Sequence, residues 1–186
     1  FSESTKSISA VSVIIFILLN LSLISYSFVS RIPIIDKQYK IIPITNNKKN
    51  IITIKYKKVI EEIKSLVDNG YQEVVLTGIH TGHYGSDIET TFPQLLREIV
   101  KIKELKRLRI SSIEITELND DFLNVLKEFP VIVSHLHVPL QAGSDEILKL
   151  MNRKYDLNYF YNKIEAIRKI RPQISITTDV LVGFPG

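Results

Sequence analysis

The chain contains no cysteine among its 186 residues. This absence excludes disulfide bonds and any metal site built from thiolates. Its one glycine-rich loop, residues 78–85, has the spacing of neither a Walker A motif nor a dinucleotide-binding fingerprint. The sequence also lacks a serine nucleophile elbow, so acyl-transfer chemistry has no support.

Charge is absent from a long stretch near the beginning of the chain, because no Asp, Glu, Lys or Arg occurs from Ser7 to Ser30. Within it, Ala10 to Val29 is rich in Ile, Leu, Val and Phe, and its length is close to the roughly 20 residues of a membrane-spanning helix. Serine and asparagine interrupt this run, and its β-branched residues suit a strand as readily as a helix. A membrane segment therefore remains an open alternative.

Basic residues then dominate residues 37–58, which supply most of the net charge of +4. Such a segment could lie against phosphate, but it lacks aromatic-basic interleaving of an RNA-binding type, so a solvated linker is favoured. We predict a boundary here. Residues 1–55 form an atypical segment that is first apolar and then basic, and its amino-acid composition is that of an out-of-frame, linker or membrane-like sequence. Residues 56–186 form an incomplete core. The first residue is Phe1 and the last is Gly186, within a turn, which indicates a partial chain.

Helical and strand patterns alternate from Tyr56 onward. Strands are predicted at 73–78, 107–112, 131–139 and 174–182. Helices are predicted to end near Gly70 and to begin at four capping residues, Thr91, Asn119, Ser144 and Asp156. Strands joined by single crossover helices should be parallel neighbours with right-handed connections. The pattern therefore predicts an α/β fold, either an open sheet or a partial (β/α) barrel.

Polar residues follow the strands where each one ends. Because carboxyl ends of parallel strands meet at one edge of the layer, we expect a ligand site there. The candidate binding residues are Thr77, Gly78, His80, Ser112, Glu114, Gln141 and Arg153.

Several of these signals have a second interpretation. His80 and His83 could be metal ligands, but no carboxylate or thiol lies at a matching spacing, so exposed loop residues are favoured. Glu114 could accept ribose hydroxyls or simply face solvent. His135 and His137 share one face of a strand and suit hydrogen-bonded interior positions. Arg153 could reach back to a carboxylate or balance a helix end.

Four motifs in this order closely resemble the radical S-adenosylmethionine (SAM) methylthiotransferases that modify tRNA beside the anticodon. The motifs are Leu76 to Gly85, Arg109 to Glu114, Pro139 to Tyr155 and Thr178 to Gly186. The first of them, Leu-Thr-Gly-Ile-His-Thr-Gly-His-Tyr-Gly, is most similar to the branch acting on N6-threonylcarbamoyladenosine. The resemblance covers about Val59 to Gly186.

The resemblance implies a partial (β/α) barrel of parallel strands in which a [4Fe-4S] cluster, reduced by an electron donor, cleaves SAM to a 5′-deoxyadenosyl radical. A methylthio group is then inserted into a tRNA adenosine, and the location implied is the cytoplasm. Thr77, Gly78 and His80 would border the SAM methionine group, Ser112 and Glu114 its ribose, and Gln141 and Arg153 the opposite wall. No catalytic residue and no metal ligand is assigned.

The missing cysteines are a severe departure from this family, whose cluster is held by a Cys-x3-Cys-x2-Cys motif followed by Ile-Ile-Pro. Here Tyr39 to Pro43 places Lys37 and Lys40 where the second and third cysteines belong, and an ammonium group has no lone pair for iron. We therefore expect a truncated chain that cannot ligate the cluster and is inactive alone, so its status as an enzyme is open. The alternatives are a cluster-free SAM- or nucleotide-binding module and a membrane-anchored, membrane-associated α/β domain.

Overall fold

The computed structural model describes residues 39–46, 52–78 and 80–185. All of them belong to the second of two units into which the chain divides, residues 37–186. The apolar run Ala10 to Val29 and the residue Lys37 lie outside the described residues. Among the residues that are described, none forms a helix with the length and apolar character needed to cross a membrane.

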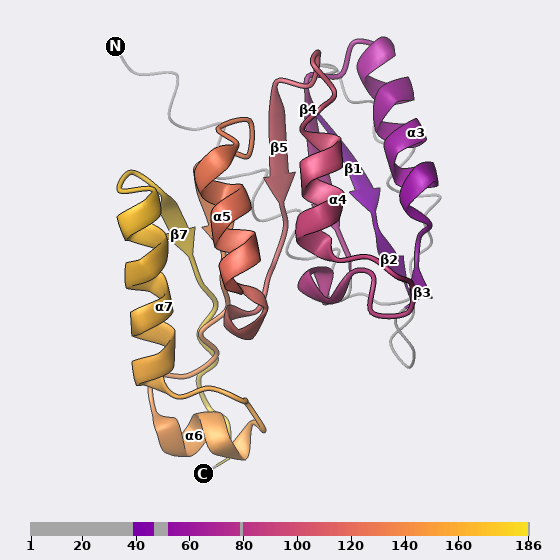
Figure 1. The fold of residues 1–186 in the computed structure, drawn as a ribbon. Helices are drawn as coiled ribbons and strands as arrows, with labels where there is room; N and C mark the ends of the chain where they lie inside the picture. The colour runs from indigo at the N-terminus through magenta and orange to yellow at the C-terminus, as the bar shows by residue number, and fades with distance from the viewer. Residues whose placement is uncertain (1–38, 47–51, 79, 186) are drawn as a thin grey trace, which may run out of the picture. The chain divides into compact units, whose positions relative to one another are not determined.

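Parallel strands form the centre of this unit (Figure 1). Strand β4 (Glu73–Thr77) lies between β1 (Tyr39–Pro43) and β5 (Arg107–Ile110), and both neighbours are parallel to it. Strands β6 (His135–His137) and β7 (Ser175–Thr177) form a second parallel pair. Isolated parallel bridges, Leu108 to Ile132 and Ser112 to His137, connect the β5 segment to the β6 segment. The strand segments therefore follow one another in chain order.

Two very short strands, β2 (Thr45–Asn46) and β3 (Ile52–Thr53), pair antiparallel beside this layer. The helices between the parallel strands are α3 (Tyr56–Asp68), α4 (Phe92–Ile99), α5 (Asp120–Glu128), α6 (Asp145–Leu150) and α7 (Leu157–Ile170).

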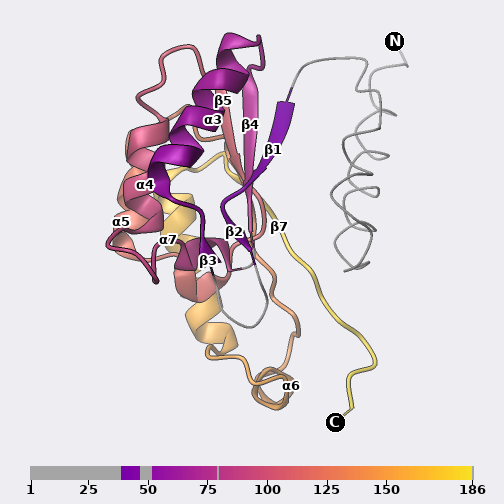
Figure 2. The ribbon, with the colours of Figure 1, turned by 90° about the vertical axis from the view of Figure 1, so that its right-hand side faces the viewer.

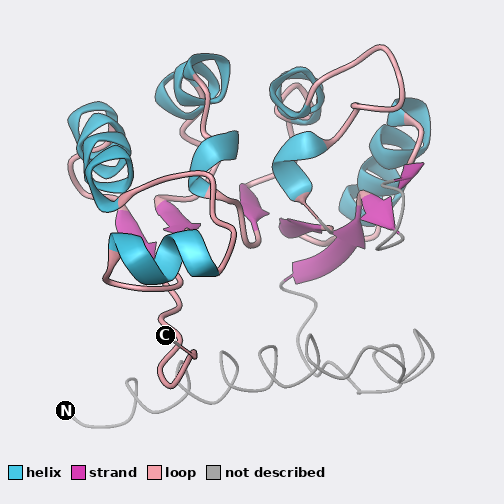
Figure 3. Ribbon diagram, turned by 90° about the horizontal axis from the view of Figure 1, so that it is seen from below, coloured by secondary structure: helices cyan, strands magenta, loops and turns pink. Residues whose placement is uncertain are grey.

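Helices α3, α4, α5 and α7 all lie on the same face of the strand layer (Figures 2 and 3). A doubly wound sheet places helices on both faces and reverses its strand order, whereas a (β/α) barrel keeps one helical face and a sequential order. The predicted partial barrel is confirmed, and the open-sheet alternative is excluded for the described part of the chain.

Side-chain alternation along the strands divides the two faces. Val74 and Leu76 on β4 are fully buried and belong to a core that also contains Ile63 of α3 and Leu95 of α4. Glu73 and Thr77 point to the opposite face, because successive strand residues alternate. This second face therefore carries polar side chains, among them Thr77, the first of the predicted binding residues.

Local capping chemistry sets the helix starts. The Thr91 side chain and Gln94 form a capping box at α4, and Asn119 Oδ1 accepts a hydrogen bond from Phe122 N at 2.8 Å. Ser144 and Asp156 cap α6 and α7 in the same way. All four predicted helix starts are confirmed, because each cap satisfies an amide that the helix itself leaves unpaired.

The strands differ from the predicted pattern in two ways. Strand β1 was not predicted, and it contains Lys40, which pairs with Val74, as well as the fully buried Ile42. The third and fourth predicted strands are much shorter than 131–139 and 174–182, because the ladder of β6 and β7 covers only three pairs. Beyond this ladder, Val180 and Val182 are exposed to solvent, so these two apolar residues do not mark a buried strand in the described structure.

Candidate functional site at the strand carboxyl ends

The predicted binding residues all lie at or beyond the carboxyl ends of the parallel strands. Thr77 ends β4, and Gly78 and His80 follow it directly. Ser112 and Glu114 follow β5, and Gln141 and Arg153 lie after β6. Thr77 and Gln141 belong to strand segments that are two places apart in the layer, because β5 lies between β4 and β6. A site that uses all seven residues must accommodate an extended ligand.

Glu114 and Arg153 meet directly, although they are far apart in the sequence. Arg153 Nη1 donates to Glu114 Oε1 at 3.1 Å, and both side chains are partly exposed. The Arg153 Nε atom is buried and has no hydrogen-bond partner among the described residues. A buried donor without an acceptor is costly, so the site can offer this N–H to a polar ligand group. Of the two alternatives for Arg153, contact with a carboxylate is the one that the structure shows.

Gln141 adopts a left-handed backbone conformation, with φ at 73°. Its amide donates to Asp179 O at 2.9 Å, and its carbonyl accepts from Leu181 N at 2.8 Å. These bonds hold the residue beside the segment that follows β7. Residues other than glycine in such a conformation persist only where the surrounding structure maintains them, and they cluster at functional sites.

His80 is the second left-handed residue of the strand-end region, with φ at 51°. It precedes the short 3-10 turn η1 (Thr81–His83). The rings of His80 and His83 stack with their centroids 5.5 Å apart, and both side chains are about half exposed. The loop conformation thus presents two imidazoles together on the surface.

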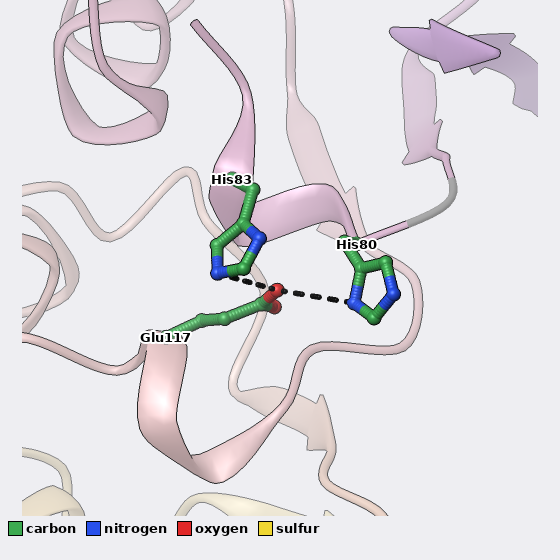
Figure 4. A group of neighbouring side chains, drawn as sticks. All are labelled: His80, His83 and Glu117. Carbon is green, nitrogen blue, oxygen red and sulfur yellow. Dashed lines mark ion pairs between the residues drawn. The ribbon is translucent and has the colours of Figure 1, made fainter. Parts of the chain in front are cut away.

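Glu117 lies between these two histidines, as Figure 4 shows. It ends the 3-10 turn η2 (Ile115–Glu117) after β5, and its Oε1 atom is 3.8 Å from His80 Nδ1 and 3.8 Å from His83 Nε2. Its Oε2 atom accepts from Glu114 N at 3.0 Å and from Gly82 N at 3.2 Å. Burial raises the pKa of Glu117 above its ordinary value, against the opposing effect of these hydrogen bonds and of His83.

A row of polar side chains also crosses the face of the strand layer opposite the helices. Arg109 Nε donates to Glu73 at 2.8 Å, and its Nη1 lies 3.3 Å from His135 Nδ1. Both His135 and His137 contact Thr177 Oγ1, at 3.1 and 2.9 Å. Burial, with added repulsion from Arg109, lowers the pKa of His135. The prediction that the two histidines share a face and are hydrogen-bonded is confirmed.

Sequence reasoning missed Glu117 and the Arg109 row for different reasons. Glu117 reaches the histidines from another strand end, so no local spacing reveals it, although both histidines are exposed in their loop as expected. Arg109 and Glu73 could have been found from the sequence, because each is a charged residue that alternates with apolar, buried residues along its strand.

Comparison with known proteins agrees with this geometry. The family profile described as the Radical SAM superfamily matches residues 36–186. A threonylcarbamoyladenosine tRNA methylthiotransferase MtaB from Bacillus subtilis is 46% identical over 131 residues, which are 69% of this chain and 29% of that protein. The MtaB protein of Thermotoga maritima is 42% identical over 68% of this chain and 29% of its own length. A tRNA-2-methylthio-N(6)-dimethylallyladenosine synthase from Hydrogenobaculum is 38% identical over 81% of this chain and 34% of its own.

The chain thus spans about a third of the length of the curated relatives that it matches. A solved structure, the cobalamin-dependent SAM radical enzyme OxsB with aqua-cobalamin bound, has a TM-score of 0.60 at 7% identity, over 76% of this chain and 23% of that one. This likeness supports the fold alone. Since the family profile matches most of the chain and the polar strand ends fit it, the chain belongs to the radical SAM superfamily and is similar to its tRNA methylthiotransferases.

Proposed function

We propose that this chain is part of the core of a tRNA methylthiotransferase acting on N6-threonylcarbamoyladenosine, and that its strand-end site binds SAM. The similarity to two MtaB proteins supports the parent activity. The single observation that carries SAM binding is the contact of Glu114 with Arg153 at the strand ends, beside a buried N–H without a partner.

The iron-sulfur cluster of the family does not fit the residues present. A [4Fe-4S] cluster is held by cysteine thiolates, and this chain contains no cysteine. Lys40, which the sequence resemblance places at a cysteine position, lies within β1 and has no lone pair to offer when protonated. We therefore assign this chain ligand binding and no radical step.

The proposed roles follow from the chemistry of each side chain. The Glu114 carboxylate accepts hydrogen bonds only, which suits the ribose hydroxyls of SAM. The Arg153 guanidinium fixes that carboxylate and offers its unpaired Nε–H. Thr77, Gly78 and His80 would border the methionine group, with Ser112 beside the ribose and Gln141 on the opposite wall.

The partners of the parent enzyme extend this proposal. The relatives are named for tRNA substrates, so tRNA is the proposed macromolecular partner, with an electron donor for the complete enzyme. A cytoplasmic location goes with a tRNA substrate. The membrane alternative depends on Ala10 to Val29, and carbonate-resistant membrane association that is lost on deleting those residues would support it.

Equilibrium dialysis of the iron-free 186-residue chain with labelled SAM tests the proposal, with ATP as a competing nucleotide. We expect saturable SAM binding that Glu114→Gln and Arg153→Ala each weaken at least about tenfold, the equivalent of about 1.4 kcal/mol. Glu165→Gln is the matched control, because Glu165 pairs with Arg168 at 3.7 Å on the exposed surface of α7.

Three results would contradict the assignment. The first is absence of SAM binding by a chain that unfolds cooperatively, and the second is equal SAM binding by the Glu114 and Glu165 variants. Tighter binding of ATP than of SAM would favour the nucleotide-binding module instead.

A further inference from the structure

We propose that His80, His83 and Glu117 form a binding site for one divalent transition metal ion such as Zn²⁺. Each residue offers one ligand atom, and these atoms all lie within 4.8 Å of one another. This is the one such group of three found among the residues that the structure describes. The inference does not rest on the proposed function, since it concerns a mononuclear site without thiolates.

The geometry is close to that of a three-ligand metal site. Zinc bonds to imidazole nitrogen and carboxylate oxygen of about 2.0–2.2 Å place neighbouring tetrahedral ligands about 3.3 Å apart. The Oε1 atom of Glu117 is 3.8 Å from a nitrogen of each histidine, and all three ligand atoms lie within 4.8 Å of one another. The two glutamate–histidine pairs must therefore close by about half an ångström, and the histidine–histidine pair by up to about 1.5 Å. His80 and His83 are 46% and 57% exposed and can make this adjustment at the surface, whereas the carboxylate is fixed.

The carboxylate itself supplies the independent observation. The Glu117 side chain is 1% exposed, and its Oε1 atom has no hydrogen-bond partner while it points between the two imidazoles (Figure 4). The Oε2 atom is held by the amides of Gly82 and Glu114, so the carboxylate cannot turn away without losing both bonds. A buried oxygen without a donor carries a desolvation cost that a cation would remove.

The ligand set defines the class of ion. Two imidazoles with one carboxylate form a set found for zinc and other first-row transition metals, while Mg²⁺ and Ca²⁺ prefer oxygen ligands alone. Three protein ligands leave a fourth position for water or a substrate group, which distinguishes the site from a closed structural one. If SAM also contacts His80, SAM and the metal ion would compete for the same side chain, so metal affinity is measured in the absence of SAM.

Co²⁺ titration of the chelator-treated 186-residue chain, followed by visible absorption and then by Zn²⁺ competition, tests this inference. We expect one ion per chain with a tetrahedral Co²⁺ spectrum that Zn²⁺ abolishes. His83→Gln and Glu117→Gln should each weaken binding at least about tenfold. His135→Gln is the matched control, because it removes a half-buried histidine from the face of β6 and should leave affinity unchanged.

The variants separate metal binding from folding. Glu117→Gln keeps a side-chain oxygen for the Gly82 and Glu114 amides, and His83 is exposed enough that its replacement cannot disturb the core. Unchanged Co²⁺ affinity in His83→Gln would overturn the inference, because the cluster would then be a histidine–glutamate ion pair only. Equal weakening by His135→Gln would overturn it too, since binding would then be nonspecific.

Discussion

The loop that presents His80 and His83 depends on a glycine at its end, and Gly85→Ala is expected to destabilise the protein strongly. Gly85 has φ at +89°, a conformation that side chains disfavour. A Cβ atom added there would lie 2.2 Å from the backbone oxygen of Thr90. Because that oxygen belongs to the main chain just before α4, it cannot move aside as a flexible side chain could.

Two other glycines allow the size of the effect to be worked out. Gly70 has nearly the same φ, +88°, but nothing lies within 4 Å of its added Cβ, whereas Gly143 has neither a positive φ nor a close neighbour. Backbone strain costs about 1–3 kcal/mol of stability, and overpacking costs a further 1–3 kcal/mol. In the opposite direction, alanine stabilises the folded protein by about 0.4–1 kcal/mol, because it lowers the entropy of the unfolded chain. We expect losses of about 1–6 kcal/mol for Gly85→Ala and about 0–3 kcal/mol for Gly70→Ala, so that Gly85→Ala costs about 1–3 kcal/mol more than Gly70→Ala, with little change for Gly143→Ala.

Urea unfolding followed by circular dichroism measures this series. With a slope of about 2 kcal/mol per molar urea, an extra 2 kcal/mol moves the midpoint by about 1 M. Equal midpoints for Gly85→Ala and Gly70→Ala would show that the close approach of Thr90 to Gly85 does not exist in solution, and would refute the steric argument.

Three further predictions concern side chains. Burial and the nearby Arg109 lower the pKa of His135, so the folded chain binds fewer protons than the unfolded chain. The free energy of unfolding should therefore fall as the pH drops from about 6.5, the unfolded value, through the lower folded pKa. His135→Gln should flatten this part of a curve of stability against pH. Asn119→Ala removes the α5 cap and should cost about 1 kcal/mol in urea unfolding. A double-mutant cycle on Glu114 and Arg153 should give a coupling of only about 0.2–1 kcal/mol, because both side chains are partly exposed; a larger value would show that the pair is desolvated.

The elements that the sequence predicted well are those governed by local chemistry. The starts at Thr91, Asn119, Ser144 and Asp156 need only a side-chain oxygen and an amide two or three residues later. The face shared by His135 and His137 likewise follows from strand alternation. Each of these features lies within one helical turn or one strand, which is why a single sequence suffices.

The features that were missed depend on partners distant in the chain. Strand β1 forms because Tyr39 to Pro43 pairs in register with β4, and Lys40 and Pro43 weaken the strand signal that its tyrosine and isoleucines give. Glu117 is close to His80 only because β4 and β5 are neighbours whose carboxyl ends meet. The seven predicted binding residues lie on the expected edge, yet their role in SAM binding stays a prediction.

The packing of the described unit uses no thiolate, which leads to a last prediction. The core consists of buried aliphatic and aromatic side chains from the strands and from α3, α4, α5 and α7, and Glu114 and Arg153 are carried on that frame. None of these contacts involves a thiolate, so a protein treated with a chelator should still unfold cooperatively in urea. If His80, His83 and Glu117 bind Zn²⁺, the ion at 100 times its Kd should add about 2.7 kcal/mol to the free energy of unfolding. His83→Gln should lose this increment and retain the cooperative transition, whereas loss of cooperativity with the chelator alone would show that the core itself depends on metal.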